Sequence, residues 1–378
     1  MLTSLRLLHF KCFADQTWKL APLTLLCGRN GMGKSSVIQS LLLLRQSAMK
    51  KMLEVQGLLL NGDLVALGAG QDVLYQWATI EEIGMNLETE EGHQARWRFG
   101  YEPDGDVLPV QTVNDDLRIY RQSLFGDHCH YLMAERMGPR TSFDISNTQV
   151  RKHRQIGTQG EYAAHYLAAF GEEPIVNQKL AHPAAVSLQL IDQLNAWLAM
   201  VSAGARINVS EHQELDLVSL RYRFAEGGDL TQPFRACNVG FGLSYTLPVL
   251  LVLLITGPDG LLLLENPEAH LHPSGQFQMG QLLAMAAACG VQVIVETHSD
   301  HVLNGIRLAV RRRVLAPEQT AIHYFEKHQM THQVLSPRID RQGRLDVWPD
   351  GFFDQWEKSL DALLDLPSEG GPHGTVFQ

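Results

Sequence analysis

Short apolar runs and helical patterns alternate near the N-terminal end of the chain. Residues 5–10 and 23–27 are apolar and predict two strands, and the second leads directly into a glycine-rich loop. After this loop, apolar residues recur at helical spacing across residues 34–45. Strand, glycine loop and helix in this order form the local context that a phosphate-binding loop requires.

The same pattern returns further along the chain. Residues 260–264 and 291–295 are continuous apolar runs, which predict strands buried on both faces. Between them, Ser274 can cap a helix that runs to about Ala288 and stops at Gly290. The sequence therefore predicts an α/β nucleotide-binding fold whose two halves are separated along the chain.

A long stretch of different character separates these halves. Residues 76–125 show strand-like alternation, and residues 160–204 carry helical apolar stripes around 162–170 and 186–201, with Trp197 expected in the core. We divide the chain into an N-terminal half (1–75), an insertion that is first β-rich and then helical (76–235), a C-terminal half (236–335) and a small C-terminal region (336–378). The tail after about Pro367 is expected to fray.

Composition and charge are consistent with a folded α/β protein and narrow the classes of partner and compartment. Hydrophobic residues make up 45% of the 378 positions, which allows a sizeable core, and the net charge of -10 argues against a surface generally coated with nucleic acid. The five cysteines are scattered singly, as reduced thiols of a cytoplasmic protein would be. No secretory signal pattern opens the chain, and the longest apolar run, residues 245–255, is shorter than the roughly 20 residues of a membrane span.

The glycine-rich loop fits the phosphate-binding pattern GxxxxGKS. Its backbone N–H groups and the start of the next helix favour a polyphosphate such as that of ATP. In this pattern Lys34 reaches the β- and γ-phosphates, and the Ser35 hydroxyl helps to hold Mg²⁺. The predicted nucleotide-binding residues of this loop are Gly28, Arg29, Asn30, Gly31, Met32, Gly33, Lys34, Ser35 and Ser36.

Three further polar residues follow the predicted C-terminal strands. Glu265 ends the first strand, as the Mg²⁺-binding carboxylate of a Walker B pattern does, and Glu268 either orients a water or is a solvated loop carboxylate. His298 follows the second strand, where a γ-phosphate sensor would lie. The histidines of this region also leave open a metal site; they are His270, His272, His298 and His301.

The order and surroundings of these motifs resemble ABC-type ATPases of the SMC, RecF and OLD group. The segments that carry the resemblance are "LRLLHFKCF", "LTLLCGRNGMGKSSVIQSLLLL", "LLLLENPEAHLHPSGQ" and "VIVETHSDHVLNGIR". More narrowly, "YLMAERMGPR", "IGTQGEYAAHYL", "NVGFGLSYTLPVL" and "IDRQGRLDVWPDGFFDQW" are similar to a subgroup with a C-terminal domain of unknown function. The resemblance implies an ABC-type P-loop NTPase head with a β-rich insertion and a helical signature subdomain.

The resemblance also implies a second set of nucleotide contacts. "NVGFGLS" takes the place of the ABC signature, a segment that closes over the γ-phosphate bound by the other subunit of a homodimer. Its predicted contacts are Asn238, Gly240, Gly242 and Ser244. Glycines and a serine at the start of an apolar helix would offer donors to an anion, although the segment alone is also an ordinary turn before a helix.

Two departures from the group's pattern limit what the resemblance implies. Asn266 occupies the position where the group often has its catalytic glutamate, and an amide cannot act as a general base. Either Glu265 or Glu268 then acts in catalysis, or hydrolysis is slow. OLD nucleases carry a nuclease domain after the switch histidine, and only about 75 residues follow here, so we expect that this chain does not itself cut nucleic acid.

The leading hypothesis is an ATP-gated homodimer that controls a separate effector, such as a nuclease or a toxin, as in anti-phage defence. The alternatives are a slowly hydrolysing nucleotide-bound scaffold and an ATPase that binds DNA ends without an effector. A basic stretch at Arg307 and 311–313 is either a solvated helix face or a contact with DNA, RNA or a partner. Glu135, Arg136 and Arg140 support the nucleotide pocket or form internal ion pairs.

Overall fold

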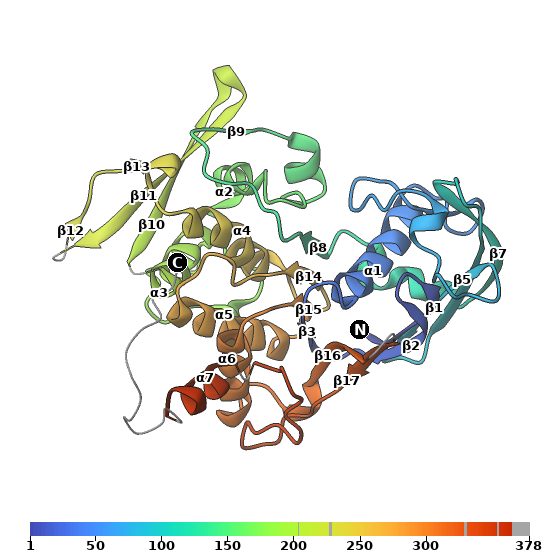
Figure 1. Ribbon diagram of the computed structural model, residues 1–378. Coiled ribbons are helices and arrows are strands. Elements are labelled where there is room, and N and C mark those ends of the chain that lie inside the picture. The colour runs from blue at the N-terminus through green and yellow to red at the C-terminus, as the bar shows by residue number, and fades with distance from the viewer. Residues whose placement is uncertain (203, 227–228, 329–330, 354, 365–378) are drawn as a thin grey trace, which may run out of the picture.

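The computed structural model describes residues 1–202, 204–226, 229–328, 331–353 and 355–364, which form a mixed α/β fold (Figure 1). The predicted α/β class is thus confirmed. The predicted frayed tail after Pro367 lies outside the described residues. No helix in the described part of the chain is long and apolar enough to cross a membrane.

A central sheet carries the two predicted α/β halves side by side. Its order is β17-β16-β3-β15-β14-β8, and its members are β3 (Leu23–Gly28), β8 (Cys129–Leu132), β14 (Leu261–Glu265), β15 (Gln292–Glu296), β16 (Thr320–His328) and β17 (Thr331–Leu335). All neighbours pair in parallel except β16 and β17. The carboxyl ends of the parallel strands therefore meet at one edge, where Glu265 pairs in register with Glu296.

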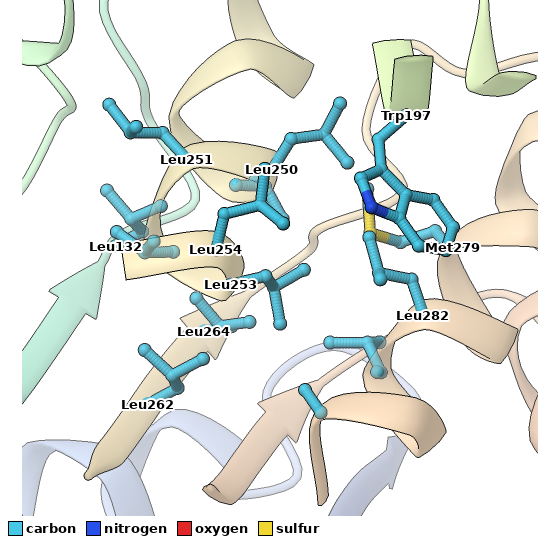
Figure 2. Close-up of a cluster of buried hydrophobic side chains, with 14 of the residues drawn as sticks. Leu132, Trp197, Leu250, Leu251, Leu253, Leu254, Leu262, Leu264, Met279 and Leu282 are labelled. Carbon is cyan, nitrogen blue, oxygen red and sulfur yellow. The ribbon is translucent and has the colours of Figure 1, made fainter. Parts of the chain in front are cut away.

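Both faces of this sheet are buried, which explains why its strands are apolar without alternation. One face packs on α1 (Lys34–Met49), and the other packs on α4 (Phe241–Ile255), α5 (Pro273–Ala288) and α6 (Asp300–Arg311). Figure 2 shows α4 leucines lying over β14, with Trp197 of α3 (Leu190–Val201) and Met279 beside them. Trp197 is buried, as predicted, and its indole N–H donates to the Leu180 carbonyl at 3.1 Å.

A second, antiparallel sheet packs on the other side of α1. Its order is β2-β1-β5-β6-β7-β4, and its members are β1 (Leu2–Phe10), β2 (Phe13–Lys19), β4 (Gly57–Leu59), β5 (Glu82–Thr89), β6 (Gln94–Gly100) and β7 (Val107–Asp115). Because β5 pairs directly with β1, the boundary predicted at residue 76 does not separate an insertion from the N-terminal half. The alternating pattern identified these strands, but their pairing partner lies far away in sequence.

The helical subdomain holds α2 (Ala163–Phe170), α3 and α4, and α7 (Gln355–Leu364) lies near the C-terminal end. The predicted stripe at 186–201 forms a helix only from Leu190, since Val186 and Leu188 are exposed and the N-cap Gln189 has an extended backbone. The cap of α5 is His272 rather than Ser274, since the His272 ring accepts the Ser274 N–H.

A third sheet in the second half of the predicted insertion was not expected. It is built on a hairpin of β10 (Ala205–His212) and β11 (Leu217–Glu226), with β9 (Phe143–Asp144), β12 (Asp229–Leu230) and β13 (Phe234–Arg235) paired to β11. In Figure 1 this hairpin projects from the helical subdomain.

Candidate nucleotide-binding site

The glycine-rich loop connects β3 to α1 through backbone conformations that favour glycine. Gly28 and Gly33 have φ values of 135° and 98°. A Cβ atom at Gly28 would lie 2.3 Å from the Phe325 carbonyl oxygen, and one at Gly33 would lie 2.5 Å from the Cys12 sulfur. Glycine is therefore required at both positions, because the φ angle is positive and because a Cβ atom would collide with its neighbours. Arg29, Asn30 and Gly31 are exposed between them, beside the N-terminus of α1.

Lys34 is buried at the start of α1 and lies across the loop. Its side chain is 3% exposed, and Nζ donates to the carbonyls of Gly28 at 3.0 Å and Arg29 at 2.8 Å. Burial lowers the pKa of Lys34, and the neighbouring Glu296 opposes that shift. The first turn of α1 and this ammonium group together form the anion-binding end of the helix that the loop pattern predicts.

Glu296, at the end of β15, contacts both predicted phosphate-loop side chains. Its Oε2 accepts the Ser35 hydroxyl at 2.8 Å, and its Oε1 lies 3.7 Å from Lys34 Nζ. Burial raises the pKa of Glu296, and Glu265 at the neighbouring strand end raises it further, whereas Ser35 and Lys34 oppose the shift. The sequence predicted Ser35 and Glu265 as the Mg²⁺ ligands, but the carboxylate that accepts the Ser35 hydroxyl is that of Glu296.

Glu265 and Glu268 are both held by other parts of the fold. Glu265 accepts the Tyr131 hydroxyl at 3.0 Å and the Ala134 N–H at 3.1 Å. Glu268 is 7% exposed, and its Oε1 accepts the His298 backbone N–H at 2.8 Å. Its Oε2 is buried without a hydrogen-bond partner among the described residues, and burial raises the pKa of this carboxyl. Glu268 therefore ties the turn after β14 to the loop after β15.

His298 faces the same cluster, as its position after β15 predicts. Its Nε2 lies 3.8 Å from Glu296 Oε1, and its side chain is 38% exposed. Burial lowers the pKa of His298, and the charge of Lys34 lowers it further. A neutral ring at neutral pH can still donate one N–H to a phosphate oxygen.

Asn266 sits in the tight turn that follows β14. Its φ of 45° lies in the left-handed region, which asparagine tolerates better than most residues. Its N–H donates to the Glu296 carbonyl at 2.9 Å, whereas its side-chain Oδ1 is buried without a partner among the described residues. The amide that departs from the group's pattern thus has a local structural reason.

Arg136 binds the backbone of the turn that follows β14. It is 2% exposed, and its guanidinium donates to the carbonyls of Glu265 at 2.8 Å and Asn266 at 2.5 Å. The same group lies 5.5 Å from the ring centroid of Tyr245 on α4, and burial lowers its pKa to about 10. Of the three residues considered in "AERMGPR", Arg136 contacts the site, whereas Glu135 and Arg140 are exposed.

We expect Arg136→Ala to destabilise the protein by about 2–4 kcal/mol, because it leaves buried carbonyls at the end of β14 without donors. Urea unfolding measures this loss. The exposed Arg140→Ala is the matched control and should stay within about 0.5 kcal/mol of wild type. Equal unfolding midpoints for the two variants would contradict the role given to Arg136.

The predicted signature residues surround the N-terminus of α4. Asn238 and Gly240 are exposed, and a Cβ atom at Gly242 would lie 2.6 Å from the His270 carbonyl oxygen. Ser244, by contrast, is 6% exposed and lines an internal cavity with Leu220 and Pro248. In this conformation the first turn of the helix directs the Ser244 side chain inward, and its contact with a partner's phosphate stays a prediction.

The histidines of this region do not form the alternative metal site. Among the described residues, no group of three histidine, cysteine, aspartate or glutamate side chains is arranged to hold a metal ion. His272 caps α5, His301 lies 3.7 Å from Asp300, and His270 packs against the Tyr245 ring. Ser35 and Glu296 instead offer oxygen ligands of the kind with which proteins hold Mg²⁺ beside a nucleotide, so these two residues fit that ion, whereas both Glu265 oxygens already accept hydrogen bonds.

Glu296 is the site residue that the sequence prediction missed. A signal was present, because an acidic residue ends the apolar run 291–295 in the same way as Glu265 ends the run 260–264. Since parallel neighbours end at the same edge of a sheet, the rule that selected Glu265 selects Glu296 as well. What the sequence could not give is the strand order that places β15, rather than β14, next to β3.

Comparisons with known proteins show which families and folds this chain resembles. A family model described as "AAA domain, putative AbiEii toxin, Type IV TA system" matches residues 121–304, and one described as "Protein of unknown function (DUF3696)" matches residues 315–363. An OLD nuclease from Thermus scotoductus is 23% identical over 317 residues, which cover 79% of this chain and 59% of that protein. The chain thus spans well under two thirds of the length of this relative.

Two solved structures show the same fold. An SMC head bound to the C-winged helix domain of ScpA has a TM-score of 0.55 and 15% identity, and the match covers 90% of this chain and 98% of that one. An SMC head with an extended coiled coil, bound to the C-terminal domain of ScpA from Pyrococcus furiosus, has a TM-score of 0.51 and 13% identity over 96% and 99% of the two chains. In its phosphate loop, its paired strand-end carboxylates and these likenesses, the chain resembles ABC-type ATPases of the SMC, RecF and OLD-like group, and its C-terminal segment matches a family of unknown function.

Proposed function

We propose that this chain binds ATP with Mg²⁺ at the glycine-rich loop and works as an ATP-gated homodimer. The observation that carries the proposal is the cluster of Lys34, Ser35, Glu296 and His298 at the start of α1. Lys34 and the first turn of α1 bind the phosphates, His298 donates to the terminal one, and Ser35 and Glu296 hold the cation. Mg²⁺, when bound, neutralises charge on the phosphate oxygens.

The exposed start of α4 supports the dimer. Phe241 is 53% exposed beside Gly240, and its ring packs against Tyr245 and His270. An exposed aromatic next to free helix N–H groups suits a surface that a second subunit's nucleotide covers. On this proposal Asn238, Gly240 and Gly242 contact the partner's nucleotide through backbone and amide groups, and Ser244 does so only if the first turn rearranges.

Slow hydrolysis follows from the groups around the turn after β14. Asn266 cannot take a proton from water, and Glu268 is buried with one oxygen already accepting the His298 N–H. The raised pKa of Glu268 suits a general base, but its burial restricts the approach of water. We therefore place the chain at the slow end of ATP turnover, close to the nucleotide-bound scaffold that the sequence left open.

Steady-state ATPase rates of four proteins test this proposal: wild type, Lys34→Ala, Glu268→Gln and Asn266→Asp. Aspartate adds a carboxylate and, like asparagine, tolerates the left-handed φ at position 266, which glutamate fits less well. We expect wild type to exceed Lys34→Ala, and Asn266→Asp to exceed wild type by about tenfold or more. A wild-type rate equal to that of Lys34→Ala would refute the proposal that this chain hydrolyses ATP. An unchanged rate in Asn266→Asp would refute the proposal that Asn266 makes hydrolysis slow.

The output of the ATP cycle passes, on this proposal, to a separate effector. The matched family is described as a putative AbiEii toxin domain, and the curated relative is an OLD nuclease, so an effector nuclease or toxin in anti-phage defence suits the group. This step depends on analogy with relatives. Affinity purification of the chain with ATP, and of Lys34→Ala as the control, tests it. A partner retained only by wild type supports effector control, and identical partners in both would contradict gating by ATP.

A further inference from the structure

The β10–β11 hairpin has one face in the core and one face outside it. Ala205, Ile207 and Tyr222 are buried and pack with α2 and α3. Because side chains alternate along a strand, the residues between them point to the opposite, outer face. In Figure 1 this sheet lies at the periphery of the helical subdomain.

Four arginines occupy this outer face. Arg206 of β10 lies directly opposite Arg223 of β11, and Arg221 of β11 lies directly opposite Arg235 of β13. Arg206, Arg221 and Arg235 are exposed, and the Nε atom of Arg223 is buried without an acceptor. We call Arg206, Arg221, Arg223 and Arg235 the arginine face. The side chain of none of the four forms a hydrogen bond or an ion pair with any described residue.

The rest of the outer face supplies almost no counter-charge. Asn208, Ser210 and Ser219 share it, and they are neutral groups that can donate hydrogen bonds. Asp144, opposite Leu217, is an acidic residue on this side, and it lies at the far end of the sheet from Arg223. Like charges directly opposite each other destabilise a sheet pair, and this happens twice here, in a chain whose net charge is -10.

We propose that the arginine face binds the phosphate backbone of a nucleic acid strand. Residues two apart on a strand are about 6.7 Å apart, and neighbouring strands are about 4.8 Å apart. One strand of a duplex carries a phosphate for about every 3.4 Å of helix axis, so arginines at this spacing on long side chains can contact several neighbouring phosphates. Arginine also pairs with phosphate through two parallel N–H···O bonds, which suits this planar, repeated arrangement.

The basic stretch singled out in the sequence does not offer an equivalent surface. Arg307 donates to the Gly343 carbonyl and to Asn304 Oδ1, both at 2.8 Å, and its guanidinium lies 5.4 Å from the Trp348 ring centroid. Only Arg311, Arg312 and Arg313 remain exposed there, at the end of α6. They provide a control of equal charge on a different surface.

The arginine face does not involve the nucleotide site, so its test stands apart from the proposed function. Fluorescence anisotropy measures binding of a short labelled strand to wild type, to Arg206→Gln/Arg221→Gln/Arg235→Gln, and to Arg311→Gln/Arg312→Gln/Arg313→Gln. Each protein is measured between about 50 and 200 mM salt with single-stranded DNA, duplex DNA and RNA of one sequence, which identifies the form that is bound.

We expect the arginine-face variant to bind on the order of 100-fold more weakly than wild type at low salt. The slope of log affinity against log salt should become shallower by about 3, or about 1 for each phosphate contact removed. The control variant should keep both the affinity and the slope. Because the variant removes like charges that face each other, its unfolding temperature should not fall below that of wild type. If the unfolding temperature does fall, the single variant Arg221→Gln replaces the triple variant, and its salt slope should change by about 1.

Three results would overturn the proposal. Wild type could fail to bind any of the three nucleic acids at about 50 mM salt. The arginine-face variant could keep the affinity and salt slope of wild type. The control variant could lose as much affinity as the arginine-face variant, which would mean that binding follows total charge rather than this surface.

Discussion

Lys34→Ala is expected to weaken ATP binding on the order of 100-fold or more. The Lys34 ammonium is buried at the start of α1 and donates to two loop carbonyls, so it holds the loop shape and offers its charge to the phosphates. Truncating one partner of a buried charge pair costs about 2–5 kcal/mol, and each 1.4 kcal/mol is a factor of ten in affinity. Titration with a fluorescent ATP analogue measures the loss.

A second lysine at the end of the same helix provides the control. Lys50 is exposed and pairs with Asp63 at 3.2 Å, so Lys50→Ala should leave ATP affinity unchanged. Removing Lys34 also leaves the buried Glu296 carboxylate without its positively charged partner. The double variant Lys34→Ala/Glu296→Gln should therefore recover part of the thermal stability that Lys34→Ala loses. Unchanged ATP affinity in Lys34→Ala would exclude the glycine-rich loop as the nucleotide site.

Glu296→Gln is expected to remove most of the Mg²⁺ dependence of ATP binding. The carboxylate accepts the Ser35 hydroxyl and lies beside Lys34, so the amide loses the negative charge that attracts the cation. Changing a residue that supports a metal ligand typically lowers metal affinity 10–100-fold, and we expect a decrease of that order here. ATP affinity measured with Mg²⁺ and with a chelator separates this effect from general damage, because binding in chelator should be unchanged.

Glu265→Gln is the matched control for this residue, since Glu265 ends the neighbouring strand and is engaged by Tyr131 and Ala134. If Glu265 is the main cation ligand, as the sequence alone suggested, Glu265→Gln will lose Mg²⁺ dependence and Glu296→Gln will keep it. That outcome would reverse the assignment made here.

The pH dependence of stability provides a further check on Glu296. Its pKa is raised in the folded protein, so the fold favours the protonated form. The stabilisation from this group is complete below the ordinary glutamate pKa and is lost as pH rises through the raised value. Relative to wild type, Glu296→Gln should therefore gain thermal stability as pH rises through this window, as unfolding temperatures across the pH range would measure.

The sequence predicted the parts of the site whose residues are local. The phosphate loop needs strand, glycines and helix within about 20 positions, and each is visible in the printed sequence. The parts that it could not predict depend on pairing over long distances. Glu296 acquires its role because β15 lies between β3 and β14, and β5 joins β1 although about 70 residues separate them.

The β10–β11 hairpin was missed although its signal was present. Residues 205–210 and 218–224 alternate between apolar and polar side chains, which is the pattern of a half-buried strand. The polar positions of this alternation include three residues of the arginine face, Arg206, Arg221 and Arg223. The burial of Ser244 could not be predicted, because a helix start fixes the direction of each side chain in its first turn, which sequence spacing alone does not specify.

The segment that matches the family of unknown function includes all of β16, and residues 320–325 of β16 pair with β3, the strand that ends at Gly28. Its Phe325 carbonyl approaches Gly28 so closely that a methyl group there would collide with it. Deleting this segment would therefore remove a strand of the central sheet beside the glycine-rich loop and not a detachable accessory. On the proposal that this loop binds ATP, a partner that binds the C-terminal region would act on a strand that adjoins the nucleotide site.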